Sequence, residues 1–109
     1  MKYELNLVDR LNLLNKLPEK GDFITLKILR QLKESLSMNE KEIKHFNIKQ
    51  TGDQVTWDVS KAAETKEIEI GEKTLDIIQD ALKKLNESKD LTEREFNLYE
   101  TFVENPKEE

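Results

Sequence analysis

The sequence contains no cysteine, and this absence removes several kinds of chemistry at once. Without thiols the chain can form no disulfide framework, no cysteine nucleophile and no cysteine-ligated zinc or iron–sulfur site. It has a single histidine, His45, so it can supply neither a histidine pair for a metal nor alternative histidines for a catalytic triad. We therefore expect no catalytic residues, no metal and no cofactor.

Long apolar runs are also absent. No stretch approaches the roughly 20 apolar residues that a membrane-spanning helix needs. Residues 1–6 lack the basic segment and apolar run of a secretory signal. We expect neither export by a standard signal nor insertion into a membrane, and we place the protein in the cytoplasm.

What the sequence has in excess is charge. Charged residues make up 38% of its 109 residues and hydrophobic residues 36%, but the apolar residues recur at regular spacings, which favours a folded domain over disorder. The net charge is -5, although residues 1–33 carry seven basic and four acidic side chains. An acidic body argues against nonspecific binding to nucleic acid, which depends on Lys and Arg at phosphates.

Residues 23–36 are the most apolar stretch. At helical spacing its apolar side chains cover well over half of the circumference, so we expect a central helix that other elements wrap. Asp22 is placed to accept a hydrogen bond from the free amides at its start. The apolar residues are Phe23, Ile24, Leu26, Ile28, Leu29, Leu32 and Leu36. The polar strip that remains consists of Lys27, Arg30, Gln31 and Glu34, with Lys33 on its margin.

Before this helix, alternation over residues 2–7 predicts a strand with one buried face. From Val8 the spacing becomes helical, with a start signal at Asn6 and a stop at Pro18. The apolar face of this helix is predicted from Val8, Leu11, Leu14 (with Leu13) and Leu17.

After the central helix, Ser37 and Glu40 fit a capping box, which predicts a short helix to about Phe46 with Ile43 and Phe46 inward. Residues 48–50 and 55–59 predict a hairpin that turns at Gly52 and carries Trp57 on its buried side. Further elements are predicted as a strand at 67–70, a helix from 72 to about 86, and a final helix that begins at a Thr92–Glu95 capping box and docks through Phe96, Tyr99, Phe102 and Val103.

Together these elements predict a single α+β domain over residues 1–104, followed by a frayed acidic tail at 105–109. We expect about four strands in a small, mainly antiparallel sheet. Four or five helices should pack largely on one face of that sheet, around the central helix at about 23–36.

The strongest candidate for a binding site is the basic strip Lys27, Arg30, Gln31 and Lys33, because it concentrates positive charge on an acidic molecule. It is either the solvated edge of a buried helix or a contact surface for an acidic partner. Other polar residues have simpler interpretations, since Glu67 and Glu69 fall on a solvated face and His45 falls at a helix end, where free carbonyls favour a cation.

Five stretches of the chain together suggest a relationship to known sequences: Leu17–Phe23, Thr25–Arg30, Val55–Trp57, Ile68–Glu72 and Leu91–Glu93. Through them the chain resembles small uncharacterised proteins encoded by bacteriophages and prophages. This resemblance implies a bacterial host cytoplasm and no established activity, and it assigns no functional residue.

The sequence favours a non-enzymatic protein-interaction module, such as a phage accessory protein that binds a host protein or self-associates as a homodimer. A second hypothesis is a winged-helix-like DNA-binding regulator, because helix, helix and hairpin follow one another from Phe23 to Val59. Its groove-entering helix would carry Glu40 and Glu42 beside Lys41 and Lys44, which makes it nearly neutral where a basic face is expected. A third hypothesis is a small-ligand-binding protein that uses the region of Trp57.

Overall fold

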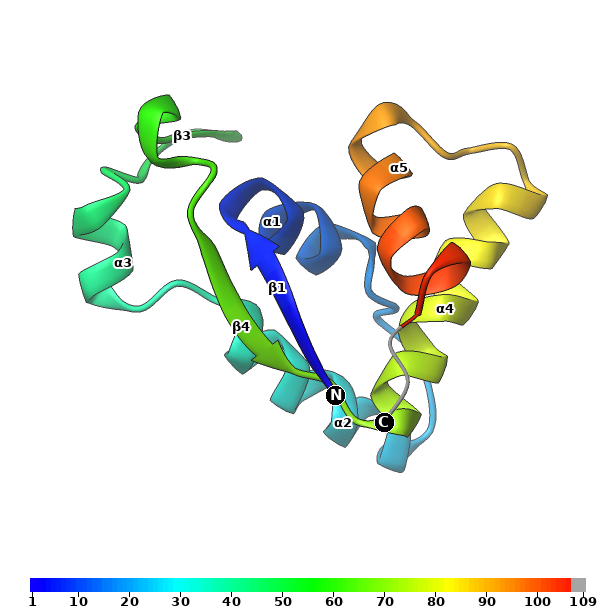
Figure 1. The fold of residues 1–109 in the computed structure, drawn as a ribbon. Coiled ribbons are helices and arrows are strands. Elements are labelled where there is room, and N and C mark those ends of the chain that lie inside the picture. Colours follow the sequence, from blue (N-terminus) through cyan, green and yellow to red (C-terminus); the bar gives the residue numbers. More distant parts are fainter. Residues whose placement is uncertain (107–109) are drawn as a thin grey trace.

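The centre of the fold is a pair of antiparallel strands that lie far apart in the sequence (Figure 1). The computed structural model describes residues 1–106, in which β1 (Lys2–Asn6) pairs with β4 (Thr65–Glu69). Alternation along β1 buries Tyr3 and Leu5 and exposes the residues before and between them. The period-2 pattern predicts both strands, and the structure confirms them with small shifts of their ends.

Helix α1 (Leu7–Lys16) follows β1 without a loop, because the Asn6 side chain caps it by accepting a hydrogen bond from the Asp9 amide at 2.8 Å. The start and end of this helix are as predicted, but its predicted inward face is confirmed only at Leu13 and Leu17. The alternation that points Tyr3 and Leu5 into the core continues to Leu7, which is the first residue of α1. Because no loop separates the strand from the helix, the buried position of Leu7 fixes which face of α1 points inward. The buried residues are therefore Leu7, Arg10 and Leu13, whereas Val8, Leu11 and Leu14 are only half-buried.

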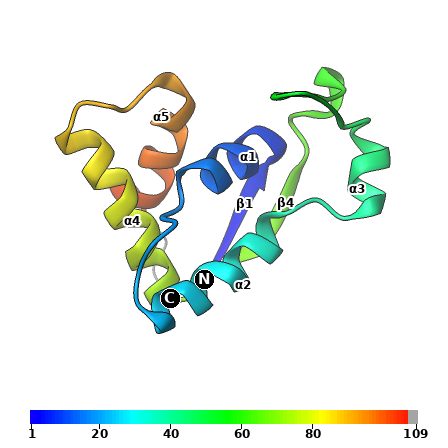
Figure 2. The ribbon, with the colours of Figure 1, turned by 180° about the vertical axis from the view of Figure 1, so that it is seen from behind.

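Helix α2 (Phe23–Leu36) has the predicted bounds, and the Asp22 side chain caps it through the Thr25 amide at 2.8 Å. The expectation that other elements wrap this helix is wrong. Figure 2 shows α2 along the outer side of the molecule. Only one row of its apolar side chains packs against β4, α1 and α4, so most of the remaining circumference faces solvent. The buried row is Leu29, Leu32 and Leu36.

Helix α3 (Glu40–His45) begins at a different cap from the predicted one. Asn39 is the N-cap and forms a reciprocal capping box with Glu42, whereas the Ser37 hydroxyl donates to the Lys33 carbonyl oxygen at the end of α2. The Ser37–Glu40 box is therefore wrong, because Ser37 still belongs to the preceding helix end. Of the two residues predicted inward, Phe46 is buried, whereas Ile43 is exposed.

The predicted hairpin is present as β2 (Lys49–Thr51) and β3 (Gln54–Thr56), which turn at Gly52 with φ +61°. However, it does not join β1 and β4, so the predicted four-stranded sheet is wrong, and the strands within residues 1–106 form two separate two-stranded sheets. All side chains of β2 and β3 are exposed, which leaves no apolar row to share with the central strands. Trp57 follows β3 and is only half-buried, rather than inward in the middle of an arm.

After the 3-10 turn η1 (Val59–Lys61) and β4, helix α4 (Glu72–Glu87) confirms the predicted helix from 72. Helix α5 (Glu93–Tyr99) starts at the predicted Thr92–Glu95 capping box and continues as the π-helical turn η2 (Glu100–Glu104).

The predicted docking of this last helical segment is confirmed at Phe102, which is fully buried, and at Tyr99 and Val103, which pack against the core. It is wrong at Phe96, which is 60% exposed, and the fully buried Leu98 was not among the predicted residues. Residues 107–109 of the predicted tail lie outside the described residues.

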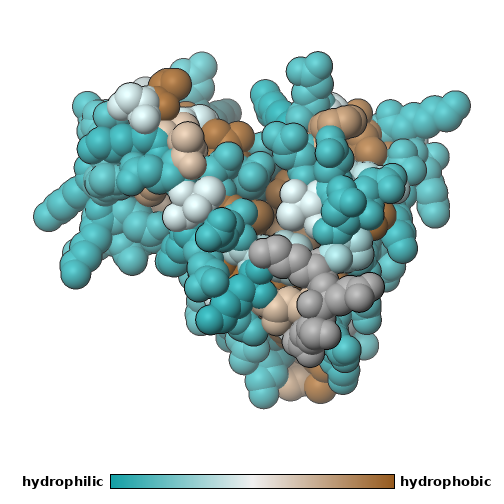
Figure 3. Space-filling model, in the orientation of Figure 1, coloured by the Kyte–Doolittle hydropathy of each residue, from teal (hydrophilic) through white to brown (hydrophobic). Residues whose placement is uncertain are grey.

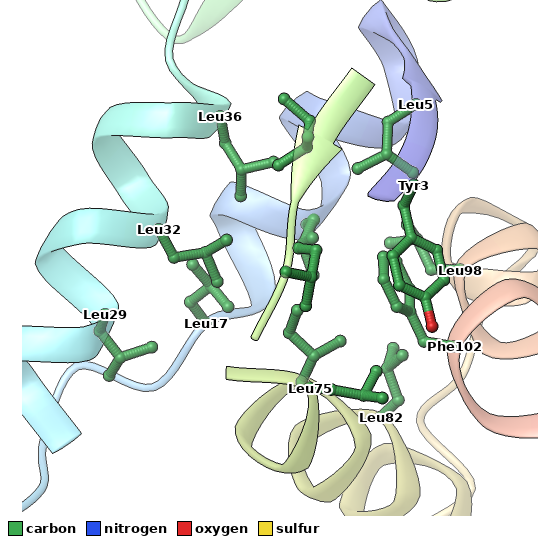
Figure 4. Packing of buried hydrophobic residues seen from close by; sticks show 14 residues of the cluster. Tyr3, Leu5, Leu17, Leu29, Leu32, Leu36, Leu75, Leu82, Leu98 and Phe102 are labelled. Carbon is green, nitrogen blue, oxygen red and sulfur yellow. The ribbon is translucent and has the colours of Figure 1, made fainter. Parts of the chain in front are cut away.

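The core lies between α1, α2, α4, α5 and the β1–β4 pair (Figure 4). The rings of Tyr3 and Phe102 meet there with centroids 4.7 Å apart. The fold is thus a single α+β domain, with helices around a very small central sheet. Among residues 1–106, no helix is both long and apolar enough to cross a bilayer.

Candidate functional site: the outer face of helix α2

Four residues of α2 form a continuous exposed face, which we call the α2 surface: Phe23, Leu26, Lys27 and Arg30. Their spacing of three, four and seven residues places them side by side on a helix. Together they line an open hollow of about 310 Å³. Hydrophobic atoms gather at the lower tip of the molecule in Figure 3, over the start of α2.

The apolar side chains of this face are unusually exposed. Phe23 is 77% exposed and Leu26 41% exposed, and the neighbouring Ile24 is 58% exposed. Scattered single exposures are ordinary in a soluble protein, whereas adjacent large ones mark interaction sites more often. The sequence predicts these residues as part of the core because α2 is so apolar, whereas the structure places Phe23, Ile24 and Leu26 on the surface.

The structure divides the predicted basic strip. Lys27 and Arg30 line the hollow beside the apolar side chains, whereas Gln31 and Lys33 are exposed on its flanks and do not line it. Within residues 1–106, no salt bridge involves Lys27, Arg30 or Lys33. The α2 surface therefore combines apolar area with cationic groups that have no acidic partner in the described part of the chain.

A buried arginine anchors the far end of α2. Arg10 is 1% exposed, and it donates from Nε to the Leu36 carbonyl oxygen at 3.1 Å and from Nη2 to the Ser37 carbonyl oxygen at 2.9 Å. Its Nη1 contacts Oε2 of Glu42 at 2.5 Å. Arg10 thus satisfies carbonyls that the end of a helix leaves free, and it ties α3 to α2.

The charge of Glu42 depends on this contact. The hydrogen bond from Arg10 lowers the pKa of Glu42 to about 2, against the opposing effect of burial. A further cation, Lys66, lies 3.5 Å from Glu42 Oε1. Sequence reasoning missed this pair, although the position of Arg10 midway between Leu7 and Leu13 on one helix face was a usable signal. We interpret the pair as support for α2, because it lies at the C-terminal end of that helix and not on the α2 surface.

The buried carboxylate Glu95 is also structural. Burial by itself raises its pKa, but hydrogen bonds from Thr92 and from Lys16, whose Nζ lies 3.1 Å from Oε1, outweigh burial and lower the pKa of Glu95 to about 2. These contacts join the start of α5 to the end of α1. The capping-box prediction identified Glu95 but not its complete burial.

His45 lies at the end of α3, where it was predicted. Its Nε2 is 2.8 Å from Oε2 of Glu64, and both side chains are about half-exposed. Lys61 donates to the His45 carbonyl oxygen at 3.0 Å. Glu67 and Glu69 are exposed, as predicted. In the described part of the chain, no group of three His, Asp or Glu side chains is placed to hold a metal ion.

Trp57 lies in a different hollow, of about 510 Å³, between α1, the β2–β3 hairpin and the start of α5. Its apolar lining includes Val8, Leu11 and Val55, and Arg94 lies at the α5 side. Figure 3 shows a notch between the lobe that carries α3 with the hairpin and the lobe that carries α5. The half-burial of Trp57 is explained by this position on the wall of an open hollow.

Comparison with known proteins assigns no function to the α2 surface or to the Trp57 hollow. The chain matches no protein-family model, no curated protein and no solved structure.

Proposed function

We propose that the protein is a non-enzymatic interaction domain that docks a partner protein on the α2 surface. The observation that carries this proposal is the 77% exposure of Phe23 beside the hollow that it forms with Leu26, Lys27 and Arg30. Moving an exposed aromatic side chain of this size out of water stabilises a complex by about 1.5 to 3 kcal/mol. The association with a partner that covers the α2 surface is therefore stabilised by a hydrophobic free energy that the isolated domain does not have.

The anchoring of α2 supports the same role. Its end is held by Arg10 and its inner row is buried at Leu29, Leu32 and Leu36, so the outer face is presented on a fixed helix. Binding groups on a rigid element lose less conformational entropy on association than groups on a mobile loop. The resemblance to phage and prophage proteins favours a host protein as the partner.

Of the two alternatives, the Trp57 hollow gives the small-ligand hypothesis a specific location, because its volume lies in the range of small-molecule sites. The DNA-binding regulator stays a lower-ranked hypothesis. Helix α3 exposes Glu40 as well as Lys41 and Lys44, and its Glu42 is held by Arg10, so that short helix presents little excess positive charge.

Site-specific photo-crosslinking tests the proposed function. The photoreactive residue p-benzoylphenylalanine replaces Phe23 in one variant and Phe96 in a matched control, since both positions hold an exposed phenylalanine on a helix. After irradiation of cells that express each variant, we expect discrete protein adducts from position 23 and none of the same mass from position 96. The proposed function is wrong if position 23 gives no adduct, or if both positions give the same adducts.

A further inference from the structure

We propose that the segment recognised by the α2 surface is an acidic amphipathic helix, with apolar side chains one turn apart and carboxylates beside them. This inference rests on the proposed function and specifies its partner. It follows from the order of groups on the surface, where two apolar residues, Phe23 and Leu26, adjoin two cations, Lys27 and Arg30.

The spacing of these groups suits a helical partner. Phe23 and Leu26 are three residues apart, as are Lys27 and Arg30, so each pair spans about 4.5 Å along the axis of α2. The hollow between them is bordered by one helix and is open on its other sides. A partner helix can lay an i, i+3 or i, i+4 apolar pair into such a hollow and place carboxylates over the cations.

Charge argues against a second copy of this chain as the occupant through a symmetric contact. In a two-fold α2–α2 packing, the same patch meets itself, so Lys27 and Arg30 of one copy approach the cations of the other. Only Glu34 on the outward side of α2 could offset them. An acidic helix instead pairs with both cations, and each exposed pair contributes up to about fivefold in affinity.

The apolar part of the α2 surface argues against nucleic acid, and its small extent argues against membranes. A phosphate backbone offers no apolar side chains, so it would leave Phe23 and Leu26 against polar groups. The inner row of α2 is occupied by the core, so only a few side chains at its start could enter a bilayer.

The experiment uses the full-length ¹⁵N-labelled protein and defined probes. One probe is a designed helical peptide of Glu and Ala with two leucines three residues apart, and its matched control has Lys in place of every Glu. Nuclear magnetic resonance titrations follow the chemical shifts of the backbone amides as each peptide is added. They are run at about 50 mM and 300 mM NaCl, because the electrostatic screening length differs more than twofold between these salt concentrations. We expect residues 23–33 to shift with the Glu peptide, more weakly at high salt, and not with the Lys peptide.

Charge reversal provides the decisive variant. Lys27→Glu/Arg30→Glu should weaken binding of the Glu peptide at least about tenfold, because two attractive pairs become repulsive, and should allow the Lys peptide to bind. Both residues are exposed, so the variant should fold, which its amide spectrum verifies. The matched control Lys83→Glu, on the outer face of α4, should leave the affinity unchanged.

Several results would overturn the inference. These are equal binding of the two peptides, no shift at residues 23–33 with the Glu peptide, or an affinity that survives charge reversal. Stronger binding to phosphatidylglycerol vesicles or to a 16-base-pair DNA duplex than to the Glu peptide would also overturn it. If crosslinks form from position 23 but persist after charge reversal, the proposed function holds and the acidic-helix inference fails. If no crosslinks form, the proposed function itself fails.

Discussion

The buried arginine that joins α1, α2 and α3 should be among the most sensitive positions in the protein. We predict that Arg10→Met, which keeps much of the aliphatic stem, lowers the free energy of unfolding by about 3 to 5 kcal/mol, since two carbonyl oxygens and a partly buried carboxylate each lose a donor at a cost of about 1 to 3 kcal/mol. The structure supplies the reason. The substitution leaves the carbonyl oxygens of Leu36 and Ser37 without their guanidinium donor, and Glu42 without its closest cation. Urea denaturation followed by circular dichroism measures the change.

A double-mutant cycle isolates the interaction energy between Arg10 and Glu42 from their contacts with other residues. Glu42→Gln removes the carboxylate charge, so Arg10→Met/Glu42→Gln should lose less stability than the two single changes together, with a coupling energy of about 0.5 to 3 kcal/mol. The physical reason is that the double variant no longer contains a partly buried carboxylate that has lost its guanidinium partner. Additive effects, or a loss below about 1 kcal/mol for Arg10→Met alone, would refute the reasoning.

The same pair predicts a pH dependence. The pKa of Glu42 is about 2 in the folded protein, against an ordinary value of 4.5, so the stability that it contributes is complete above about pH 4.5 and is lost as the pH falls toward 2. In Arg10→Met the main cause of the lowered pKa is gone. The stability difference between the wild type and this variant should therefore narrow as the pH falls from 4.5 to 2, and a constant difference would contradict the assignment.

Two further substitution pairs test the core and the caps by the same denaturation assay. Leu29→Asp should destabilise the domain by more than about 4 kcal/mol and leave it largely unfolded, because it buries an unpaired charge, whereas Lys27→Ala should change stability by less than about 0.5 kcal/mol. A folded Leu29→Asp variant would show that α2 does not contribute to the core as described. Asn39→Ala should cost about 1 kcal/mol as the loss of an N-cap, whereas Ser37→Ala should cost less. The reverse order would restore Ser37 as the capping residue.

Local chemistry in the sequence was sufficient to place most helices and strands. Caps act over three residues, so Asn6, Asp22 and Thr92 could be recognised without knowledge of the fold, and the structure confirms all three. Alternation likewise marked the strand that became β1, because side-chain direction in a strand depends only on position along it. The binding candidates Lys27 and Arg30 were found in the same way, from their spacing on one predicted helix.

Only the tertiary structure decided which of these faces are buried. The sequence shows how apolar α2 is, but the number of neighbours that reach it depends on how α1, α4 and β4 pack, and they cover a single row. Phe23 and Ile24 consequently belong to the surface and not to the core. The burial of Arg10 depends on carbonyl oxygens 26 and 27 residues away, and the pairing of β1 with β4 depends on partners 59 to 67 residues apart. Periodicity describes a face of a helix or strand, whereas burial requires a partner for that face, and the partner is set by the fold.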